Sequence, residues 1–512
     1  MNNLEEQYKD IKESKMFKSQ EEKIERWGKK VDRHPLRSEF QRDRDRILYS
    51  RAFRRLSGKT QVFRTGNDDH IRTRLTHTLE VSQIARTISK ELGLDEDLTE
   101  AIALGHDLGH TPFGHVGERT LNQIMNGCYI IGDFNTDMMK SDMKKGFKHN
   151  LQGARVVNEL EESPLNLTKE TIFGIIHHSS MSYKECNKDG FSNCDLKHKN
   201  RNNEECSKQY KLDFYDYITK EIEYDKFWSL EALVVAMADE IAQRHHDIED
   251  AIEFKIISPE NLSNTINDCF GDMIEEDSLH YNTLIKLSDK VDKYEMLSNF
   301  SKFIVDFLTT DLINESKKNI IKMKYKFNIT SADEFYDKKS LIYKDVKTFE
   351  NEKHKNYIFN VIKFSDDTKE GDKKLQKFLK NRILKSFEAQ RMDGLGSYVI
   401  TKLFEAYTHN PQQLSDKAIK RLYKNIYNNK VGLESKLEEL DKYTKIIKDI
   451  KDTDDVGEIR DVIGKLHYQV MDGKLEVDEI YKDILLRTIC DYIGGMTDNY
   501  ALNEHKVLYN HD

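Results

Sequence analysis

The sequence is poor in proline, the residue that most strongly interrupts helices. Five prolines, Pro35, Pro112, Pro164, Pro259 and Pro411, are spread over 512 residues. Long stretches rich in Lys, Glu, Leu and Ile fill the intervals between them. This composition predicts an all-α protein in which strands are minor.

Cysteine is also scarce, with six residues in the whole chain. Such a count in a chain of this length does not indicate a disulfide scaffold. Cys186, Cys194 and Cys206 share one polar segment with His198, but no C-x-x-C spacing is present. The segment therefore fits a plain loop better than a zinc site.

Long apolar runs are missing as well. No stretch approaches the roughly 18 to 20 apolar residues that a membrane helix requires, and the start M-N-N-L-E-E-Q-Y-K-D is too polar for a signal peptide. With 38% hydrophobic and 33% charged residues, the chain can bury a large core as one elaborated domain or two closely packed ones. We expect a cytoplasmic protein without a membrane partner.

The formal net charge of -9 argues against a protein that coats nucleic acid. Basic side chains nevertheless crowd into one short stretch: Arg42, Arg44, Arg46, Arg51, Arg54, Arg55, Lys59, Arg64, Arg72 and Arg74. This stretch either receives an anion locally or is a solvated basic face that nearby carboxylates partly neutralise. Those carboxylates are Asp43, Asp45, Asp68 and Asp69.

The chain divides into three parts by its residue pattern. Residues 1–35 are charged and helix-prone, and we expect them to form a peripheral N-terminal helical arm. Residues 36–255 carry the histidine-rich motifs and are predicted to form a helical core. Residues 256–512 consist mostly of amphipathic helix, which predicts a C-terminal helical region that completes the pocket and makes oligomer contacts.

The stretch from Ala101 to Glu118, A-I-A-L-G-H-D-L-G-H-T-P-F-G-H-V-G-E, concentrates ionisable residues among glycines. Its apolar start predicts a helix that ends near His106 and Asp107. His110, His115 and Glu118 then fall on the following turn and the start of the next helix. An isolated His-Asp pair is usually a hydrogen-bonded core pair, but five ionisable residues so close together favour half of a metal site.

Two other helices offer partners for His106 and Asp107. The first begins near Arg74 and has an apolar stripe that we place at Leu75, Leu79, Ile84 and Ile88, with His77 on or beside it. A buried imidazole there is either a satisfied core residue or a metal ligand. The second is strongly apolar and is interrupted by Asp239, whose carboxylate is costly to bury unless it is paired or bound to metal.

His77, His106-Asp107 and Asp239 reproduce the H…HD…D order of the HD phosphohydrolase superfamily. More narrowly, several motifs resemble the deoxyguanosine triphosphate triphosphohydrolase (dGTPase) family. They are G-K-T-Q-V-F, T-R-L-T-H-T-L-E-V, H-D-L-G-H-T-P-F-G-H-V-G-E, A-D-E-I-A with H-D-I-E-D-A, and D-Y-I-G-G-M-T-D. The resemblance covers about residues 35–255 and recurs near 487–502. It implies an all-α fold with an HD-domain helical core and an additional C-terminal helical region.

The resemblance also implies an activity, the hydrolysis of a deoxynucleoside triphosphate (dNTP) to deoxynucleoside and tripolyphosphate. Its metal ligands would be His77, His106, Asp107 and Asp239. Two imidazoles and two carboxylates suit a divalent ion such as Mn²⁺, Mg²⁺ or Fe²⁺. The ion would lower the pKa of a bound water and neutralise phosphate charge.

The remaining roles follow from positions that match the family's motifs. His115 matches the catalytic histidine, Glu118 the carboxylate that orients it, and His110 a histidine beside the phosphates. The matching substrate-binding positions are Arg74 at the phosphates, Gln61 and Asp247 at the 3′-hydroxyl, and Gln243, Arg55 and His149 around the pocket. Asn150 and Gln152 are further pocket candidates.

Two positions depart from the family pattern: Gln243 stands where many relatives have tyrosine, and Asn499 where a basic residue is common. The base preference is therefore left open. Relatives also imply a homo-oligomer, a tetramer or hexamer, with single-stranded DNA (ssDNA) or a dNTP as effector. Two other functions remain open: an HD phosphodiesterase or phosphohydrolase acting on another nucleotide, and a regulatory protein that responds to nucleotide or ssDNA.

Overall fold

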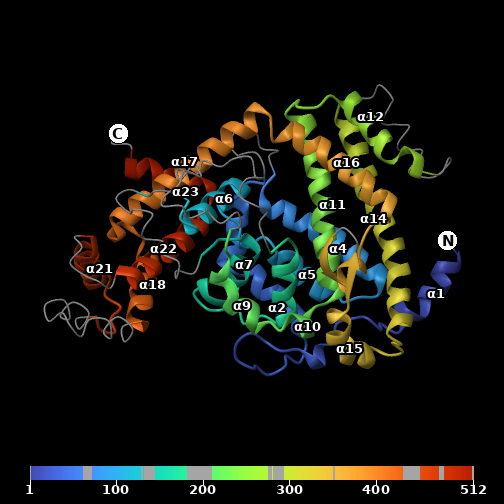
Figure 1. Ribbon diagram of the computed structural model, residues 1–512, viewed down its shortest axis with the longest axis horizontal. Helices are drawn as coiled ribbons and strands as arrows, with labels where there is room; N and C mark the ends of the chain where they lie inside the picture. Colours follow the sequence, from blue (N-terminus) through green and yellow to red (C-terminus); the bar gives the residue numbers. More distant parts are fainter. Residues whose placement is uncertain are drawn as a thin grey trace.

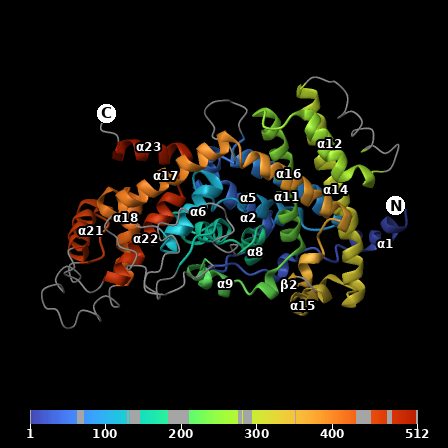
Figure 2. The same cartoon turned by 45° about the horizontal axis from the view of Figure 1, so that its top comes forward.

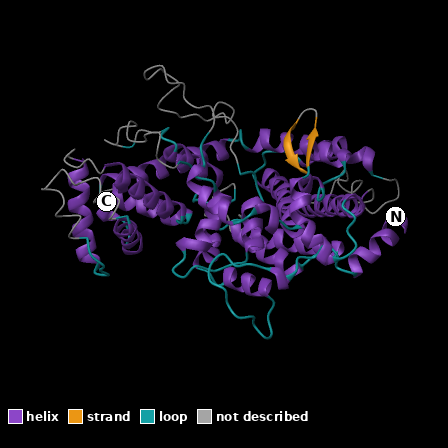
Figure 3. Cartoon of the chain, turned by 60° about the horizontal axis from the view of Figure 1, so that its bottom comes forward, coloured by secondary structure: helices purple, strands orange, loops and turns teal. Residues whose placement is uncertain are grey.

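The computed structural model describes residues 2–61, 72–128, 131, 145–181, 210–274, 280, 293–349, 352–429, 450–471 and 478–509. The cysteine-containing segment around Cys194 and the carboxylates Asp68 and Asp69 lie outside these residues. Within them the only sheet is an antiparallel hairpin of β1 (Val346–Phe349) and β2 (Glu352–Asn356), drawn in orange in Figure 3. The predicted all-α fold is confirmed.

Helices build the rest of the regular structure. They are α1 (Asn2–Glu13), α2 (Glu39–Leu48), α3 (Arg51–Arg55), α4 (Arg74–Leu92), α5 (Glu96–Gly105), α6 (Gly114–Met125), α7 (His149–Arg155), α8 (Lys169–His177), α9 (Asp216–Glu221), α10 (Tyr224–Phe227), α11 (Leu230–Glu253), α12 (Pro259–Phe270), α14 (Lys293–Lys326), α15 (Ala332–Lys344), α16 (Asp366–Ile383), α17 (Phe387–His409), α18 (Asp416–Asn428), α21 (Val456–Met471), α22 (Asp478–Gly494) and α23 (Asp498–Tyr509). Among the described residues, no helix combines the length and apolarity needed to cross a membrane.

Local sequence signals fix several of these helix starts. Thr73 caps α4, Asp95 caps α5 and Ser229 caps α11, each by accepting a hydrogen bond from a backbone N–H in the first turn. Ser50 does the same for α3 and thereby separates it from α2, so the stretch from Phe40 to Leu56 forms two helices. The capping residues therefore place the beginnings of the helices that carry the candidate site.

The first hydrophobic core is organised around α11. This helix packs against α4, α5, α8, α14 and α16 (Figure 1). Its side chains Leu233, Val234 and Ile241 are buried, as the strongly apolar sequence predicts. Fully burying side chains of this size contributes about 1.5 to 3 kcal/mol each. The core therefore holds α11 rigidly beside α4 and α5.

The buried face of α4 differs from the stripe that the sequence suggests. Leu79 is 49% exposed, whereas Val81, Ala85 and Ile88 are buried. His77 belongs to this buried face because its side chain is 1% exposed. The prediction for Leu79 was wrong because α4 faces α5 and α11, and helical spacing alone does not reveal on which side its neighbours lie.

A second hydrophobic core gathers most of the C-terminal helices. Helices α17, α18, α21 and α22 lie together at the end of the molecule that carries the C-terminus (Figure 2). Helix α6, from the histidine-rich stretch, packs on α17 and α22, and Val116 and Leu121 of this helix belong to the second core together with Phe113 just before it. Conversely, buried side chains of α14, α15 and α16 belong to the first core. The two cores therefore do not divide at residue 255.

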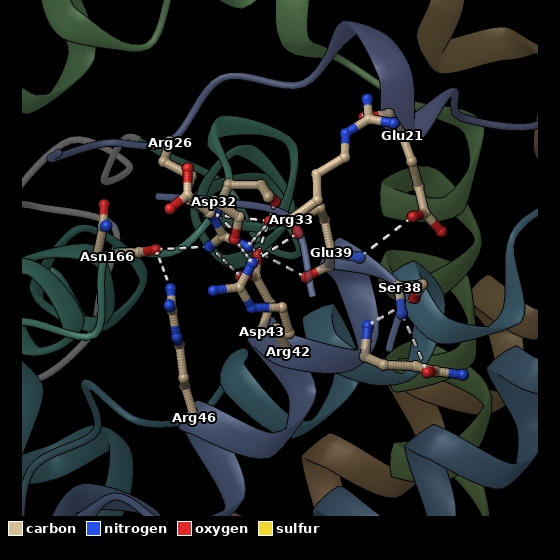
Figure 4. Close-up of polar contacts among 12 residues, drawn as sticks. Glu21, Arg26, Asp32, Arg33, Ser38, Glu39, Arg42, Asp43, Arg46 and Asn166 are labelled. Atoms are coloured by element: carbon tan, nitrogen blue, oxygen red, sulfur yellow. Dashed lines mark hydrogen bonds and ion pairs between the residues drawn. The ribbon is translucent and has the colours of Figure 1, made fainter. Parts of the chain in front are cut away.

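The N-terminal segment is less peripheral than we expected. Tyr8 and Ile11 of α1 are buried in the first core, and the Tyr8 hydroxyl donates to the Leu92 carbonyl over 3.0 Å. Farther along, the Arg26 guanidinium donates to the Asp43 carboxylate over 2.7 Å and to the Asn166 carbonyl over 2.7 Å (Figure 4). Apolar burial and a buried arginine thus anchor this segment.

Much of the basic stretch is paired locally. Arg42 donates to a Glu39 carboxylate oxygen over 2.7 Å, and Arg46 donates to the Asn166 carbonyl over 2.6 Å (Figure 4). Arg44 bonds the adjacent Asp45. Arg42 and Arg44 therefore belong to a basic face that nearby carboxylates partly neutralise. Arg74, at the end of the stretch, instead points into the candidate site.

Candidate active site

Side chains from α4, α5 and α11 meet beside the first core. His77 lies in the first turn of α4, His106 is the C-cap of α5, and Asp239 lies midway along α11. The Asp239 Oδ1 atom is 3.0 Å from His77 Nε2 and 3.8 Å from His106 Nε2. Asp107 Oδ1 is 3.4 Å from His106 Nε2. The structure thus brings together the four side chains that the sequence singled out.

The hydrogen bonds of His106 suit a metal ligand. Its Nδ1 atom lies 2.6 Å from the Ala103 carbonyl, which can only accept, so Nδ1 carries the proton. The Nε2 atom is buried and has no hydrogen-bond partner among the described residues. His77, His106 and Asp107 place their ligand atoms close enough to share one ion. These residues fit a divalent cation, whose bond would satisfy the lone pair on His106 Nε2.

Both carboxylates remain ionised in this setting. Burial raises the pKa of Asp239, but the neighbouring imidazoles of His77 and His106 outweigh it and lower the pKa overall. Burial also opposes ionisation of Asp107, whereas His106, His110 and Arg74 hold its pKa well below the ordinary value. A buried carboxylate, Asp107, and a partly exposed one, Asp239, facing two imidazoles favour a cation at this place.

Arg74 places unused donors beside the carboxylates. Its Nη1 atom donates to Asp107 Oδ2 over 2.9 Å. Its Nε and Nη2 atoms are buried and have no partner among the described residues. Gly114, with φ of +59°, lets the chain pass so close that an added Cβ would lie 3.3 Å from Nη2. A planar guanidinium with two free N–H groups is suited to bind a phosphate oxygen.

A row of histidines extends from this cluster toward α6. The rings of His110 and His149 stack with centroids 3.9 Å apart, and the His115 ring lies 5.6 Å from that of His110. His110 Nε2 is 3.1 Å from Asp107 Oδ1, and its Nδ1 atom is buried without a partner among the described residues. His110 therefore connects the carboxylates with the first turns of α6.

Glu118 makes bonds that the sequence did not predict. Its carboxylate accepts from Lys148 Nζ over 2.9 Å and from the His149 backbone N–H over 3.0 Å, and it also pairs with His149 Nδ1. Burial raises the pKa of Glu118, but His149 and Lys148 lower it well below the ordinary value. Glu118 thus orients His149 directly. Its predicted role in orienting His115 remains a prediction.

His115 is solvent-accessible although its surroundings are buried. Desolvation by the surrounding residues lowers the pKa of His115, with Glu118 opposing this effect and Arg74 adding to it. The ring is therefore neutral near pH 7. It offers one bare nitrogen and one N–H to a molecule in the site.

His178 is a site residue that sequence reasoning missed. It follows α8, and its Nε2 atom lies 3.1 Å from His149 Nε2. Its ring centroid is 5.1 Å from that of His106. The only signal in the sequence is a histidine pair after an apolar helix, which does not reveal that the second ring sits between His106 and His149.

The other predicted substrate positions have different surroundings. Gln61 Oε1 is buried without a partner among the described residues, and Gln243 is partly exposed one turn after Asp239 on α11. Burial raises the pKa of Asp247 to about 6, although Arg244 opposes this shift. Arg55 lines a cavity of about 400 Å³ together with Gly109 and residues of α18 and α22.

The motifs near both ends of the chain meet behind the loop between His110 and His115. Asp498 accepts from Thr60 Oγ1 over 2.6 Å and from the Phe113 backbone N–H over 3.0 Å. Lys59 Nζ donates to the Gly494 carbonyl over 3.0 Å and also bonds the His110 carbonyl. Burial, with Arg55 and Arg74 nearby, lowers the pKa of Lys59 to about 7.

These bonds show what two of the family motifs contribute to the structure. Phe113 adopts the left-handed conformation with φ of +61° immediately before α6, and the bond to Asp498 holds its backbone N–H there. G-K-T-Q and D-Y-I-G-G-M-T-D therefore fix the loop between His110 and His115.

Family models match the same parts of the chain. The HD domain model matches residues 74–241, which contain His77, His106, Asp107 and Asp239. The phosphohydrolase-associated domain model matches residues 362–430 and 462–507, which build much of the second core. The helical fold and the candidate site therefore define an HD-domain phosphohydrolase.

Curated relatives narrow the class further. The chain is 30% identical over 477 residues to the deoxyguanosinetriphosphate triphosphohydrolase-like protein of Rickettsia bellii, covering 92% of this chain and 92% of that protein. It is 33% identical over 478 residues to the protein of the same name from Rickettsia felis, covering 92% of each. A third, from Caldanaerobacter subterraneus, is 43% identical over 239 residues, covering 46% of this chain and 52% of that protein. The chain belongs to the family of deoxyguanosinetriphosphate triphosphohydrolase-like proteins.

Proposed function

We propose that the protein is a divalent-metal-dependent hydrolase that converts dNTPs, dGTP alone or several of them, to deoxynucleoside and tripolyphosphate. The observation that carries this proposal is a group of buried polar atoms without partners among the described residues, which border one site. They are Arg74 Nε, Arg74 Nη2, His106 Nε2 and His110 Nδ1. Such atoms are costly to leave unpaired, so they favour a ligand that carries a cation, phosphates and hydroxyls.

His77, His106, Asp107 and Asp239 would hold the metal, and Mn²⁺, Mg²⁺ or Fe²⁺ suits this mixture of nitrogen and oxygen ligands. A divalent ion bound there would lower the pKa of a bound water and neutralise charge on the phosphate. Arg74 would bind a phosphate oxygen through Nε and Nη2, and His110 would donate or accept through Nδ1 on the same side.

The reaction requires a proton to move from water to the leaving nucleoside. The water oxygen bonds the α-phosphorus, the bond from phosphorus to the 5′ oxygen breaks, and the 5′ oxygen gains a proton. His115 is neutral near pH 7 and accessible, so it can take the proton from water and deliver it to the 5′ oxygen. Gln61 and Asp247 would bind the 3′-hydroxyl, with Gln243, Arg55 and His149 shaping the pocket.

Product analysis tests this function. Purified protein is incubated with each dNTP and each NTP, alone and mixed, in the presence of Mn²⁺, Mg²⁺ or Fe²⁺, and the products are separated by ion chromatography. We expect tripolyphosphate and free nucleoside in equal amounts. Pyrophosphate with nucleoside monophosphate, or no attack on any dNTP while another nucleotide is cleaved, would reject the proposal in favour of a different HD phosphohydrolase.

The same proposal includes a homo-oligomer, a tetramer or hexamer, and a dNTP or ssDNA effector. Large apolar side chains on the second core support an oligomer contact, since Tyr398 of α17 is 54% exposed and Val507 of α23 is 77% exposed. Light scattering after size exclusion measures the assembly. Adding ssDNA or a second dNTP to the assay with one dNTP detects the effector, and an unchanged rate would reject it.

A further inference from the structure

A second polar cluster lies directly behind His77. The Nδ1 atom of His77, on the side of the ring away from Asp239, is 3.2 Å from Nδ1 of His246 on α11. The Nε2 atom of His246 is in turn 2.6 Å from Oε2 of Glu80 on α4. His77 and His246 are each 1% exposed. A carboxylate, an imidazole and a second imidazole thus form a line that ends at the candidate metal centre.

The hydrogen bonds along this line fix where the protons sit. A carboxylate can only accept, so the bond between Glu80 and His246 places the proton of His246 on Nε2. A neutral His246 then has a bare Nδ1, which accepts from His77 Nδ1–H. His77 consequently keeps a lone pair on Nε2, the atom 3.0 Å from Asp239. The line thus presents the tautomer of His77 that a metal ion requires.

Glu80 is held in place from its other sides. Its Oε2 atom also lies 3.1 Å from His245 Nδ1, and its Oε1 accepts from Arg72 Nε over 3.2 Å. Glu249, one turn further along α11, bonds both His245 and Arg72. The carboxylate that begins the line therefore has little freedom to turn away.

We propose that His246 is a positioning residue, which with Glu80 fixes the tautomer and ring orientation of His77 for metal binding. The inference rests on the proposed metal centre and assigns a role to residues outside the four ligands. Partners behind a metal-bound histidine commonly raise metal affinity about 10- to 100-fold. The motif H-D-I-E-D-A thus serves the metal through His246 as well as the substrate through Asp247.

Metal titration without substrate tests the inference. The metal-free full-length protein is titrated with Mn²⁺, and free Mn²⁺ is measured by electron paramagnetic resonance. We expect His246→Leu to weaken Mn²⁺ binding about 10- to 100-fold. His246→Asn keeps an acceptor oxygen near the place of Nδ1, so it should bind more tightly than His246→Leu. His246→Gln keeps only the donor to Glu80 and should bind as weakly as His246→Leu.

His245→Gln is the matched control. His245 neighbours His246 on α11 and shares Glu80, but its described hydrogen bonds run to Glu80 and Glu249 and not to His77. This variant should bind Mn²⁺ about as the wild type does, because Glu80 keeps its bonds to Arg72 and His246. Co²⁺ absorption adds a spectroscopic measurement, because a misoriented His77 should shift the ligand-field bands in His246→Gln and leave them unshifted in His245→Gln.

Each outcome decides between the alternatives. Wild-type Mn²⁺ affinity in His246→Leu, or equal weakening in His246→Asn and His246→Leu, would overturn the role of the Nδ1 acceptor. Equal losses of Mn²⁺ affinity in His245→Gln and His246→Gln would show that the effect comes from general packing and not from the bond between His246 and His77. If His246→Leu does not fold, Glu80→Gln replaces it, with a smaller loss expected because an amide oxygen still accepts from His246. No Mn²⁺ binding by the wild type would reject the metal centre itself.

Discussion

The two hydrophobic cores contribute different parts of the candidate site. The first core holds α4, α5 and α11, and with them His77, His106 and Asp239. The second core holds α6, which carries His115 and Glu118. The proposed metal ligands and the proposed acid–base residues therefore depend on separate packing. A change in one core should affect one part of the site and spare the other.

Buried polar bonds join the two parts. Asp491 of α22 accepts from Gln152 Nε2 over 2.9 Å and from Arg155 Nη2 over 2.7 Å. Asp498 bonds Thr60 and the Phe113 backbone. Such bonds depend on geometry more than apolar contacts do, so they set the position of α6 relative to the metal ligands. We therefore expect changes at the boundary between the cores to affect the proposed catalysis without affecting metal binding.

The largest effect is expected in the first core. Asp239→Ala removes a carboxylate that faces both imidazoles, so bound metal and dNTP hydrolysis should be lost together, by more than about 100-fold. Glu240→Gln, at the next position and half exposed, is the control and should retain both, because the amide oxygen still accepts from Arg244. Metal content after dialysis and the rate of tripolyphosphate release are measured. Full turnover by Asp239→Ala after chelation and washing would contradict the assignment.

A separate effect is expected where the cores meet. Asp498→Asn weakens the bonds to Thr60 and Phe113, so His115 and Gln61 should shift while the metal ligands stay in place. We expect kcat to fall about 10- to 100-fold, since a displacement of about 1 Å has an effect of this size. Mn²⁺ affinity should be unchanged, and exposed Asn503→Ala on the same helix should resemble the wild type. A parallel loss of Mn²⁺ affinity would show that the two parts are not separable.

Acid should destabilise both cores in the same way. Desolvation lowers the pKa of His177, in the first core, to about 4. It also lowers the pKa of His467, in the second, to about 4, although the His409 carbonyl opposes the shift. Below about pH 6.5 each of these histidines binds a proton in the unfolded chain, whereas in the folded chain it stays neutral down to about pH 4. The free energy of unfolding therefore falls as the pH falls. Each histidine should make the free energy of unfolding about 1 kcal/mol lower at pH 5.5 than at pH 7.

Urea unfolding of His177→Gln and His467→Gln at both pH values measures how much each histidine contributes to the pH dependence of stability. Each variant should lose less stability between pH 7 and 5.5 than the wild type does. The free energy of unfolding at pH 7 serves as the reference for each variant, because the substitution itself changes packing. A wild-type pH dependence in either variant would show that this histidine titrates normally in its core.

The smallest effect concerns the sugar. Gln243 lies one turn after Asp239 on α11 and can hydrogen-bond a sugar or phosphate, but it has no ring to pack against deoxyribose. Gln243→Tyr should therefore raise the preference for dGTP over GTP about threefold, with dideoxy-GTP remaining a poor substrate because Gln61 and Asp247 are intact. Ratios of kcat/KM measure this. An unchanged dGTP to GTP ratio would remove Gln243 from sugar selection.

The sequence predicted those features that depend on residue type and local spacing. The end of α5 at His106 and the start of α6 near His115 follow from caps and glycines, and the H…HD…D order gave four side chains that the fold brings together. These features are local, or they are required by the chemistry of a cation site whatever the fold.

Features that depend on contacts between distant helices were missed. Helical spacing placed Leu79 on the apolar stripe of α4, but the helix faces α5 and α11 with another side. Nothing near Glu118 in the sequence reveals that Lys148 and His149 will be its partners, and nothing near His178 reveals its contact with His149. A sequence reports which residues are apolar or ionisable, whereas partners are chosen by tertiary packing.

The bonds of Asp498 also order events during synthesis. Thr60 and Phe113 precede it by 438 and 385 positions, so neither hydrogen bond can form until almost the whole chain has been synthesised. A ribosome adding about 5 to 20 residues per second completes Asp239 some tens of seconds before Asp498. The growing chain therefore displays all four proposed metal ligands while the loop that carries His115 is still untied. We therefore expect the proposed nucleotide hydrolysis to begin only after translation has passed residue 498.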